Sequence, residues 1–208
     1  RKFNIVRIPK SYNSQIGVPL SVWQIRPEHT LGIFEAGISR MGEMAHLEPV
    51  IQPDIGIFTN LGPAHREGFP SDQAKLEEKM RLFDHAKVLV FCADHEAVAR
   101  AAQSWVQAKP GRRLFAWSFD VQSLKFEVQS SNFELQTSNF KLQTPFSDHA
   151  SLENACHCMA TLLALGLDLT DFRNRLKRLE PVEMRLELKA GINRCIVIND
   201  SYSNDLAS

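Results

Sequence analysis

The chain contains the stretch Ile55-Gly56-Ile57-Phe58-Thr59-Asn60-Leu61-Gly62-Pro63-Ala64-His65, in which a short apolar run passes into a loop with glycine and proline. The apolar run predicts a strand, and the Gly-Pro step predicts the loop that leaves it. Asn60 and His65 therefore fall at the carboxyl end of a strand, the edge at which open α/β sheets bind ligands. This loop is the first candidate for a functional site.

A helix is predicted after this loop, with Ser71 as its N-terminal cap. It carries a lysine, Lys79, on an apolar face formed by Leu76, Leu82 and Phe83. No carboxylate lies within helical reach of Lys79, so the helix offers it no ion pair. Either its stem snorkels along the apolar face, or its pKa is lowered and the amine does chemistry.

Lys75, one turn earlier on the same helix, has different neighbours. Asp72 and Glu78 both lie within its helical reach. We therefore expect Lys75 to be an ordinary solvated residue.

Composition narrows the class of protein. The 208 residues are enough for one or two domains, and 24 basic residues balance 24 acidic ones. This balance gives no reason to expect a nucleic acid or an anionic membrane surface as a partner. No apolar run approaches the length of a membrane span and no signal-peptide pattern is present, so we expect a cytoplasmic location.

Cysteine usage fits a reducing compartment, because the four cysteines lack the spacing of a disulfide framework or a zinc ribbon. Cys156-His157-Cys158 suggests a metal ligand pair at first sight. The segment is helical in pattern, however, and residues two apart on a helix point ~200° away from each other around its axis. The sequence therefore favours buried thiols.

The remaining pattern alternates strand-like and helix-like segments. Strands are predicted at residues 31–35, 54–59, 87–92 and 113–117. Helices are predicted at residues 16–25, 40–49 and 96–108 besides the one after Ser71, with Pro49 ending the helix at 40–49. Strands separated by helices of this length indicate an α/β fold with a mostly parallel, helix-covered sheet.

A seven-residue repeat follows, in Phe126-Glu127-Val128-Gln129, Phe133-Glu134-Leu135-Gln136 and Phe140-Lys141-Leu142-Gln143. A heptad can indicate a coiled coil, but turn formers join these repeats and each repeat alternates apolar and polar residues. A small antiparallel β meander within residues 121–147 fits better. Helices are then predicted at 151–165 and 170–179, and strands at 185–188 and 195–199.

Glu35 ends one predicted strand, and we expect it at the strand end next to the Asn60–His65 loop. A carboxylate beside an imidazole, with waters completing the shell, suits a magnesium ion. The plainer alternatives are a helix-capping role for Glu35 and a hydrogen-bonded loop histidine for His65.

Four stretches in this order resemble the central, ATP-binding domain of the Mur ligases. Among these, the chain is most similar to the MurF type, UDP-N-acetylmuramoyl-tripeptide–D-alanyl-D-alanine ligase. The stretches are Asn13-Ser14-Gln15-Ile16-Gly17-Val18-Pro19-Leu20, Phe34-Glu35-Ala36-Gly37 with Gly42-Glu43, Asn60 to His65 with Glu67 and Lys79, and Ile198-Asn199-Asp200-Ser201-Tyr202. Any one of them alone would be a weak signal.

The resemblance implies roles for single residues and a reaction. Glu35 and His65 would hold Mg²⁺, and Lys79 would be carbamylated, which turns a cation into an anion that orients the metal. ATP contacts would come from Asn60, Arg185 and Asp200, and the sugar-nucleotide substrate would border Asn13, Ser14 and Gln15. ATP would phosphorylate the carboxylate of UDP-N-acetylmuramoyl-tripeptide, and the amine of D-alanyl-D-alanine would attack the acyl phosphate.

The chain also departs from the family pattern. The phosphate-loop motif Gly-x-x-Gly-Lys-Thr/Ser is absent, so we expect a P-loop NTPase-like domain at residues 1–200, truncated before that loop and inactive as an isolated fragment. Residues 201–208 would begin the linker to a missing C-terminal domain. Met184 and the segment Ser203 to Leu206 replace usual family residues and resemble the form fused to an alanine racemase.

Three alternatives remain open from the residues alone. A sibling such as a folylpolyglutamate synthetase would share the metal residues but not the turn at residues 11–19. A non-catalytic binding domain derived from a ligase would keep the fold and lose ATP affinity. In the third alternative, the match is misleading and the chain is an unrelated doubly wound protein.

Overall fold

The computed structural model describes residues 2–8, 11–62, 65–120, 123–130, 133–140, 146, 148–167, 175–176, 178–179 and 187–199. The first half contains β1 (Ile5–Arg7), α1 (Gly17–Val22), β2 (Leu31–Ile33), α2 (Glu43–Ile51), β3 (Ile55–Phe58), a 3-10 turn η1 (Arg66–Gly68) and α3 (Asp72–Arg81). The second half contains β4 (Val88–Cys92), α4 (Glu96–Ala108), β5 (Arg113–Asp120), β6 (Ser123–Ser130), β7 (Phe133–Phe140), α5 (His149–Ala164), β8 (Glu187–Ala190), η2 (Ile192–Arg194) and β9 (Ile196–Asn199).

The α/β prediction is confirmed, with one correction to the sheet. Strands β3, β4 and β5 form a parallel ladder, to which β6 and β7 add antiparallel. Strands β1 and β2 pair with each other in parallel, in a separate ladder. In the part of the chain described here, the strand before Glu35 is therefore not hydrogen-bonded to β3, contrary to the expected neighbouring strand ends.

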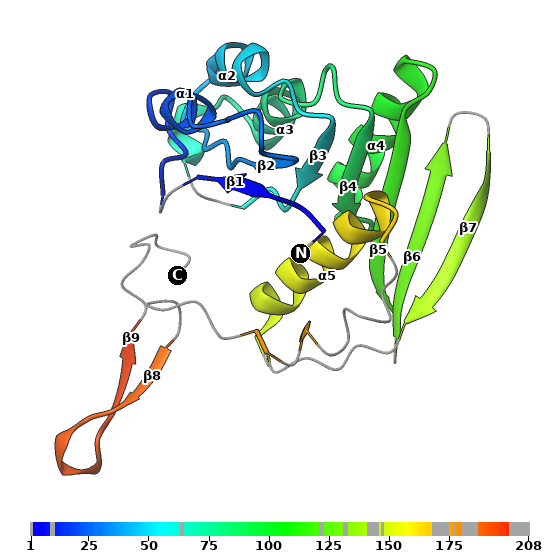
Figure 1. The fold of residues 1–208 in the computed structure, drawn as a ribbon. Helices are drawn as coiled ribbons and strands as arrows, with labels where there is room; N and C mark the ends of the chain where they lie inside the picture. Colours follow the sequence, from blue (N-terminus) through cyan, green and yellow to red (C-terminus); the bar gives the residue numbers. More distant parts are fainter. Residues whose placement is uncertain are drawn as a thin grey trace.

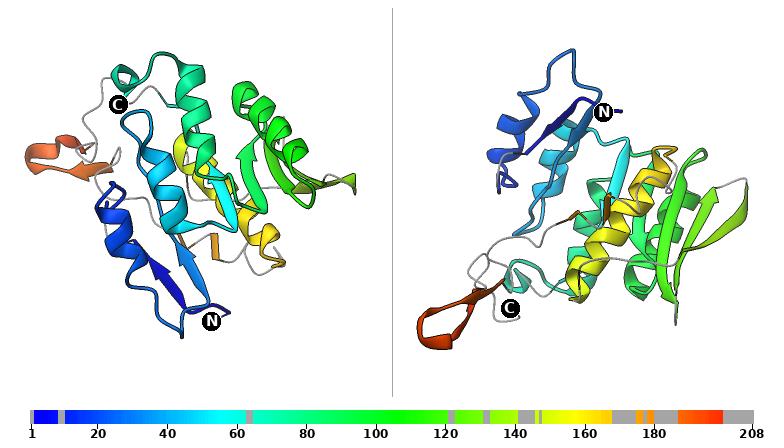
Figure 2. Two further views of the ribbon diagram at one scale, coloured as in Figure 1. Left: turned by 90° about the horizontal axis from the view of Figure 1, so that it is seen from above. Right: turned by 60° about the horizontal axis from the view of Figure 1, so that its bottom comes forward.

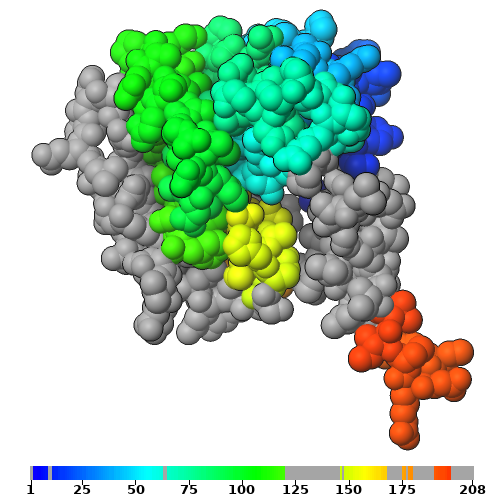
Figure 3. Space-filling view, turned by 180° about the vertical axis from the view of Figure 1, so that it is seen from behind, coloured from blue at the N-terminus to red at the C-terminus, as the bar shows by residue number. Residues whose placement is uncertain are grey.

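Helices cover both faces of the larger sheet (Figures 1 and 2). On one face, α3 and α4 pack over Phe58, Leu89 and Phe91, and the two helices lie side by side in Figure 3. On the other face, α5 packs over Val90 and Trp117. Strand β4 is buried along its whole length, because its alternate side chains enter one core and then the other.

A smaller core joins α1 to α2 through Val18, Met44 and Leu47. Helix α2 does not end at Pro49 as predicted but continues to Ile51, and Gln52 then adopts a left-handed conformation with φ of 46°. Since Pro49 lies in the last turn, it removes only one helical hydrogen bond close to the natural end of the helix.

The β meander is confirmed in kind but differs in its strands. Strand β6 pairs with β5 from Ser123 to Ser130, and β7 runs without a break through the predicted turn at residues 137–139. The pairs Glu127 with Thr137 and Lys125 with Asn139 continue the ladder across that segment. Two long strands therefore replace three short ones, and the third repeat beyond Phe140 lies outside the described residues.

Helix α5 ends where Gly166 takes a φ of 68°, as predicted. On α5, Cys156 is buried as expected but Cys158 is exposed, because the helix turns the two thiols to different sides. Cys92 is buried and Cys195 exposed, so the buried-thiol prediction holds for two of the four cysteines.

The antiparallel β8–β9 hairpin projects from the rest of the described surface (Figure 3). Most of the helix predicted at 170–179 lies outside the described residues, as do Arg185, Asp200 and residues 201–208. None of the described helices combines the length and apolar character that a membrane span requires.

Candidate active site at the loop after strand β3

Helix α3 holds the loop that follows β3 from one side. Lys79 Nζ donates to the carbonyl oxygen of Asn60 across 3.0 Å, and Lys75 Nζ donates to that of Gly62 across 2.6 Å. Nearer the start of α3, Asp72 forms a bidentate ion pair with Arg66, with N–O distances of 2.7 and 3.1 Å. Positions 72, 75 and 79 lie on one face of a helix, so three successive side chains of that face bind the loop.

Lys79 lies in surroundings that favour a neutral amine. Its Nζ is 5.5 Å from the centre of the Phe58 ring, and burial together with the charge of Lys75 lowers its pKa to about 8. The contacts of Lys79 with a carbonyl oxygen and an aromatic ring are consistent with the predicted lack of an ion pair. An amine with a pKa near 8 is partly unprotonated at neutral pH, and the unprotonated form is the nucleophile.

The prediction that Lys75 is an ordinary solvated residue is wrong. Its exposed fraction is only 2%, and its Nζ bonds the loop rather than a helical carboxylate. The two expected partners are engaged elsewhere: Asp72 pairs with Arg66, and the buried Glu78 accepts a hydrogen bond from the backbone N–H of Met44 at 2.9 Å. Tertiary contacts have overridden the helical i, i+3 pairs.

Helix α5 holds the same loop from the opposite side through His157. Its Nε2 lies 3.2 Å from the carbonyl oxygen of Thr59, and its Nδ1 accepts a hydrogen bond from Trp117 Nε1 at 3.1 Å. Burial lowers the pKa of His157 to about 4, so the ring is neutral at physiological pH. Sequence reasoning missed this residue because it treated Cys156-His157-Cys158 only as a possible metal motif.

His65 is exposed on this loop. It has a left-handed conformation with φ of 58°, and its Nδ1 is 4.0 Å from Glu67 Oε1. Three residues after His65, Gly68 lies against the backbone of Ser39, so closely that a Cβ atom on Gly68 would overlap the Ser39 carbonyl oxygen. This backbone contact brings the loop of His65 against the segment that follows Glu35.

Glu35 follows β2 and is also exposed. Its Oε1 accepts a hydrogen bond from Asn13 Nδ2 at 2.9 Å, and the Asn13 carbonyl oxygen accepts one from Gly37 N–H at 2.8 Å. Two predicted site residues, Asn13 and Glu35, are thus in direct contact. Ser14 has a local role, because its Oγ accepts from the N–H of Gly17 at the start of α1. Gln15 Nε2 is buried without a hydrogen-bond partner among the described residues.

The start of α2 is fixed between Glu35 and α3. Partial burial alone would raise the pKa of Glu43. The hydrogen bonds from Ser39 and Arg40 nevertheless hold this pKa below its ordinary value. The next residue, Met44, donates to Glu78, which is the neighbour of Lys79 on α3. The segment carrying Glu35 and the helix carrying Lys79 therefore share a hydrogen-bonded connection.

The geometry brings the predicted residues together in two groups, Asn13 with Glu35 and Asn60 with Lys79. The Gly68–Ser39 contact joins the loops of the two groups. An exposed carboxylate and an exposed imidazole on two touching loops suit a divalent cation that keeps several waters. The predicted magnesium ligands Glu35 and His65 lie on these two loops and stay a prediction, while the predicted ATP contacts of Arg185 and Asp200 fall outside the described residues.

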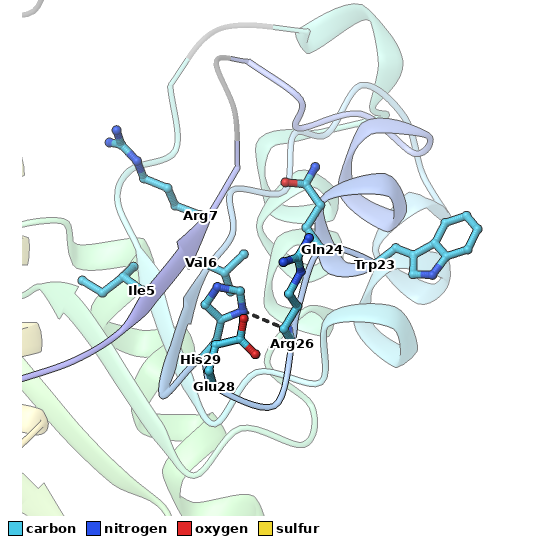
Figure 4. A pocket seen from close by; sticks show the side chains of 8 residues that line it. All are labelled: Ile5, Val6, Arg7, Trp23, Gln24, Arg26, Glu28 and His29. Carbon is cyan, nitrogen blue, oxygen red and sulfur yellow. Dashed lines mark hydrogen bonds between the residues drawn. The ribbon is translucent and has the colours of Figure 1, made fainter.

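An open pocket of about 520 Å³ lies elsewhere, between β1 and the segment after α1 (Figure 4). Trp23 at its rim is 85% exposed, and Arg26 N–H donates to His29 Nδ1 at 2.9 Å. This pocket shares no lining residue with the loop after β3, so it is separate from the candidate active site.

The loop after β3 is held by two lysines of α3 and touches the loop that follows Glu35. Residues 2–162 match the family described as the Mur ligase middle domain, and the chain belongs to this family. The resemblance seen in the sequence is confirmed.

Two curated relatives carry the name UDP-N-acetylmuramoyl-tripeptide–D-alanyl-D-alanine ligase. The one from Treponema pallidum is 42% identical over 82 residues, which is 39% of this chain and 18% of that protein. The one from Borreliella burgdorferi is 24% identical over 212 residues, which is all of this chain and 46% of that protein. The chain thus spans at most about half of these relatives.

Two solved structures show the same fold. The MurF structure from Acinetobacter baumannii superposes with a TM-score of 0.78 at 20% identity, covering 99% of this chain and 46% of that one. The MurF ligase from Thermotoga maritima in complex with ADP superposes with a TM-score of 0.69 at 21% identity, covering 97% and 48%.

Proposed function

We propose that this chain is the central, ATP-binding part of a ligase that joins D-alanyl-D-alanine to UDP-N-acetylmuramoyl-tripeptide. The main support is that a relative spanning the whole chain bears that name. A structural neighbour with the same fold was solved with ADP, which supports ATP as the nucleotide. The proposal includes the cytoplasmic location expected from the sequence.

The reaction proceeds in two stages. ATP transfers its γ-phosphoryl group to the terminal carboxylate of the tripeptide, which gives an acyl phosphate and ADP. The amine of D-alanyl-D-alanine then attacks the acyl carbon, forms the amide and releases phosphate. The protein contributes positioning and charge stabilisation to such a transfer rather than a covalent bond of its own.

We assign the ATP contacts to Asn60, Arg185 and Asp200. Asn60 is supported by the loop geometry, because Lys79 fixes its backbone carbonyl. The substrate contacts are assigned to Asn13, Ser14 and Gln15. The buried amide of Gln15 supports this assignment, since an unpartnered buried donor is costly unless a ligand or a neighbouring domain accepts from it.

Glu35 and His65 are proposed to hold Mg²⁺, which when bound neutralises charge on the transferring phosphoryl group. Asn13 orients the carboxylate of Glu35 through its amide. The Gly68–Ser39 contact keeps the two ligand-bearing loops adjacent. The protein therefore supplies a preformed cradle of two loops rather than a single rigid motif.

Lys79 is proposed to be carbamylated in the active enzyme. The lone pair of the neutral amine attacks carbon dioxide, an N–C bond forms, and the proton leaves to solvent. The lowered pKa of Lys79 supports this step, because burial and Lys75 raise the fraction of neutral amine. The product is an anion on a helix that is hydrogen-bonded to the segment after Glu35.

The 208-residue chain alone is proposed to be inactive, because it contains no phosphate-loop motif to cradle the β- and γ-phosphates. Residues 1–200 are assigned to the domain and 201–208 to the start of a linker.

The test is an ATP-dependent ligation assay of a longer protein that contains this chain, with UDP-N-acetylmuramoyl-tripeptide and a panel of amino compounds. We expect amide formation with D-alanyl-D-alanine, with one ADP released per bond, and no product with folate and glutamate. A Glu35→Ala variant controls for contaminating ligase. Turnover with folate and glutamate alone would favour the folylpolyglutamate synthetase alternative, and ATP binding with no acceptor would favour a binding module.

A further inference from the structure

A second cluster of metal-ligand side chains lies where β4 ends and α4 and α5 begin. Cys92 is the last residue of β4, His95 caps the start of α4, and Glu153 lies in the second turn of α5. One ligand atom from each of the three lies within 4.8 Å of the other two. Three separate elements thus bring sulfur, nitrogen and oxygen donors to one point.

This cluster is largely buried and carries negative charge. The Glu153 side chain is 11% exposed, and its Oε1 lies 3.1 Å from His95 Nε2 and 3.8 Å from His149 Nδ1. On the other side, Asp94 Oδ2 accepts from Cys92 Sγ at 3.8 Å and from Phe119 N–H at 2.9 Å. Within the described part of the chain, the ion-pair partners of Glu153 are His95 and His149.

We propose that Cys92, His95 and Glu153 bind a zinc ion, with His149 or a water as the fourth ligand. A thiolate, an imidazole and a carboxylate form a donor set typical of zinc, whereas magnesium avoids sulfur. The charges of one thiolate and one carboxylate would neutralise Zn²⁺. Metal–ligand bonds of about 2.0–2.3 Å place tetrahedral ligands about 3.3–3.8 Å apart, so closing the cluster needs only small side-chain movements.

The proposed zinc site is independent of the magnesium site assigned above. It shares no residue with Glu35 and His65, and the Cys92 side chain lies on the α5 face of the sheet rather than the α3 face. A metal here would tie the end of β4 to the start of α4 and the second turn of α5. Its role is therefore structural support of the strand ends, and its loss is expected to lower the thermal stability of the fold.

The experiment measures the zinc content of the purified protein. Magnesium is present in large excess, so that it occupies sites with oxygen ligands. After dialysis, we expect about one zinc ion to stay bound per chain. Cobalt(II) substitution should give a thiolate-to-metal charge-transfer band, because sulfur ligation produces it and oxygen or nitrogen ligation does not. The band should vanish in Cys92→Ser and persist in Cys156→Ser, a matched control with a buried thiol on α5.

Glu153→Gln and His95→Asn keep the thiol and test the rest of the ligand set. Loss of a residue that only hydrogen-bonds a metal ligand typically weakens metal binding ~10–100-fold, so loss of a ligand itself should weaken zinc binding at least as much. Glu35→Gln should leave binding unchanged. If Cys92→Ser fails to fold, these two variants decide the matter. The proposal is overturned if the wild-type protein retains no zinc, if the band persists in Cys92→Ser, or if both other variants bind normally.

Discussion

The indole Nε1 of Trp117 donates a hydrogen bond to Nδ1 of His157 across 3.1 Å. Because an indole nitrogen is only ever a donor, Nδ1 must be the acceptor and Nε2 must carry the ring proton. That proton points to the carbonyl oxygen of Thr59, 3.2 Å away. A tryptophan of β5 thereby sets the tautomer with which a histidine of α5 holds the loop after β3.

Replacing His157 by leucine should destabilise the protein, because the buried indole N–H of Trp117 loses its acceptor. We expect a loss of about 1–3 kcal/mol in the free energy of unfolding, measured by urea denaturation. His157→Gln, which can replace the bond to Thr59, should lose less. Cys158→Ala is the matched control on the same helix with an exposed side chain. Equal stabilities of the leucine variant and the control would show that the two hydrogen bonds contribute nothing.

Acid should weaken the wild-type protein more than His157→Gln. The pKa of His157 is about 4 in the folded protein against 6.5 as the ordinary value, so the unfolded chain binds the proton more readily. The stabilising contribution is complete above pH 6.5 and is lost as the pH falls towards 4, up to about 3 kcal/mol. The measurement is the free energy of unfolding across this window for both proteins. Parallel curves would contradict the assigned burial.

Lys79→Arg should abolish ligation in the longer protein. Arginine keeps a positive charge where the proposed carbamate places a negative one, and a loss of about 100-fold or more is expected. Lys79→Ala should lose activity too, with partial recovery in acetate, while Lys87→Arg on the surface should be silent. With labelled bicarbonate, carbon-13 NMR should show a carbamate signal that Lys79→Arg lacks. Wild-type turnover by the arginine variant would rule out the carbamate.

Glu35→Ala and His65→Ala should lower turnover without loss of stability, because both side chains are exposed. Loss of a group that stabilises transition-state charge commonly raises the barrier by about 3–4 kcal/mol. The check is turnover as a function of magnesium concentration, beside urea denaturation of each variant. Glu67→Ala, on the same loop with an 83% exposed side chain, is the control. Normal turnover of both variants at limiting magnesium would remove the metal assignment.

Gly68→Ala should reduce both stability and turnover. The new methyl group would overlap the Ser39 carbonyl, a backbone atom that cannot rotate away, so the two loops must separate. Overpacking of this kind costs about 1–3 kcal/mol, measurable in urea. Gly62→Ala is the control, because its Cβ would meet Asn60 Oδ1 at an ordinary 3.4 Å. Unchanged behaviour of Gly68→Ala would show that the contact does not position His65.

The helix at 96–108 and the strand leading into Asn60 were predictable, because the spacing of apolar residues and the residues that begin or end each element agree there. The Ser71 cap was equally predictable, and its hydroxyl oxygen accepts a hydrogen bond from Ala74 N–H at 3.1 Å. Lys79 stood out because the helix gives it no carboxylate. Local patterns thus located the candidate loop and one of its anchors.

Residues whose role depends on distant partners were not predictable. Lys75 was misjudged because its partner is a carbonyl 13 positions earlier, and His157 was missed because its partner Thr59 is 98 positions away. The separation of β1–β2 from the larger sheet was likewise not predictable, because the choice of strand partner leaves no periodic pattern in the sequence. Arg185 and Asp200 stay predictions.

Strand β4 separates the two proposed sites, and this has a consequence for combined mutations. Phe91 enters the core beneath α3 and α4, whereas Cys92 enters the core beneath α5. Both neighbours of β4 are hydrogen-bonded to it, so the strand cannot slide to pass a change from one face to the other. Substitutions in the two separate cores should therefore be additive in their effects, except where both act on the loop after β3, which α3 and α5 hold together. Away from that loop, the two faces of this sheet can accumulate changes independently.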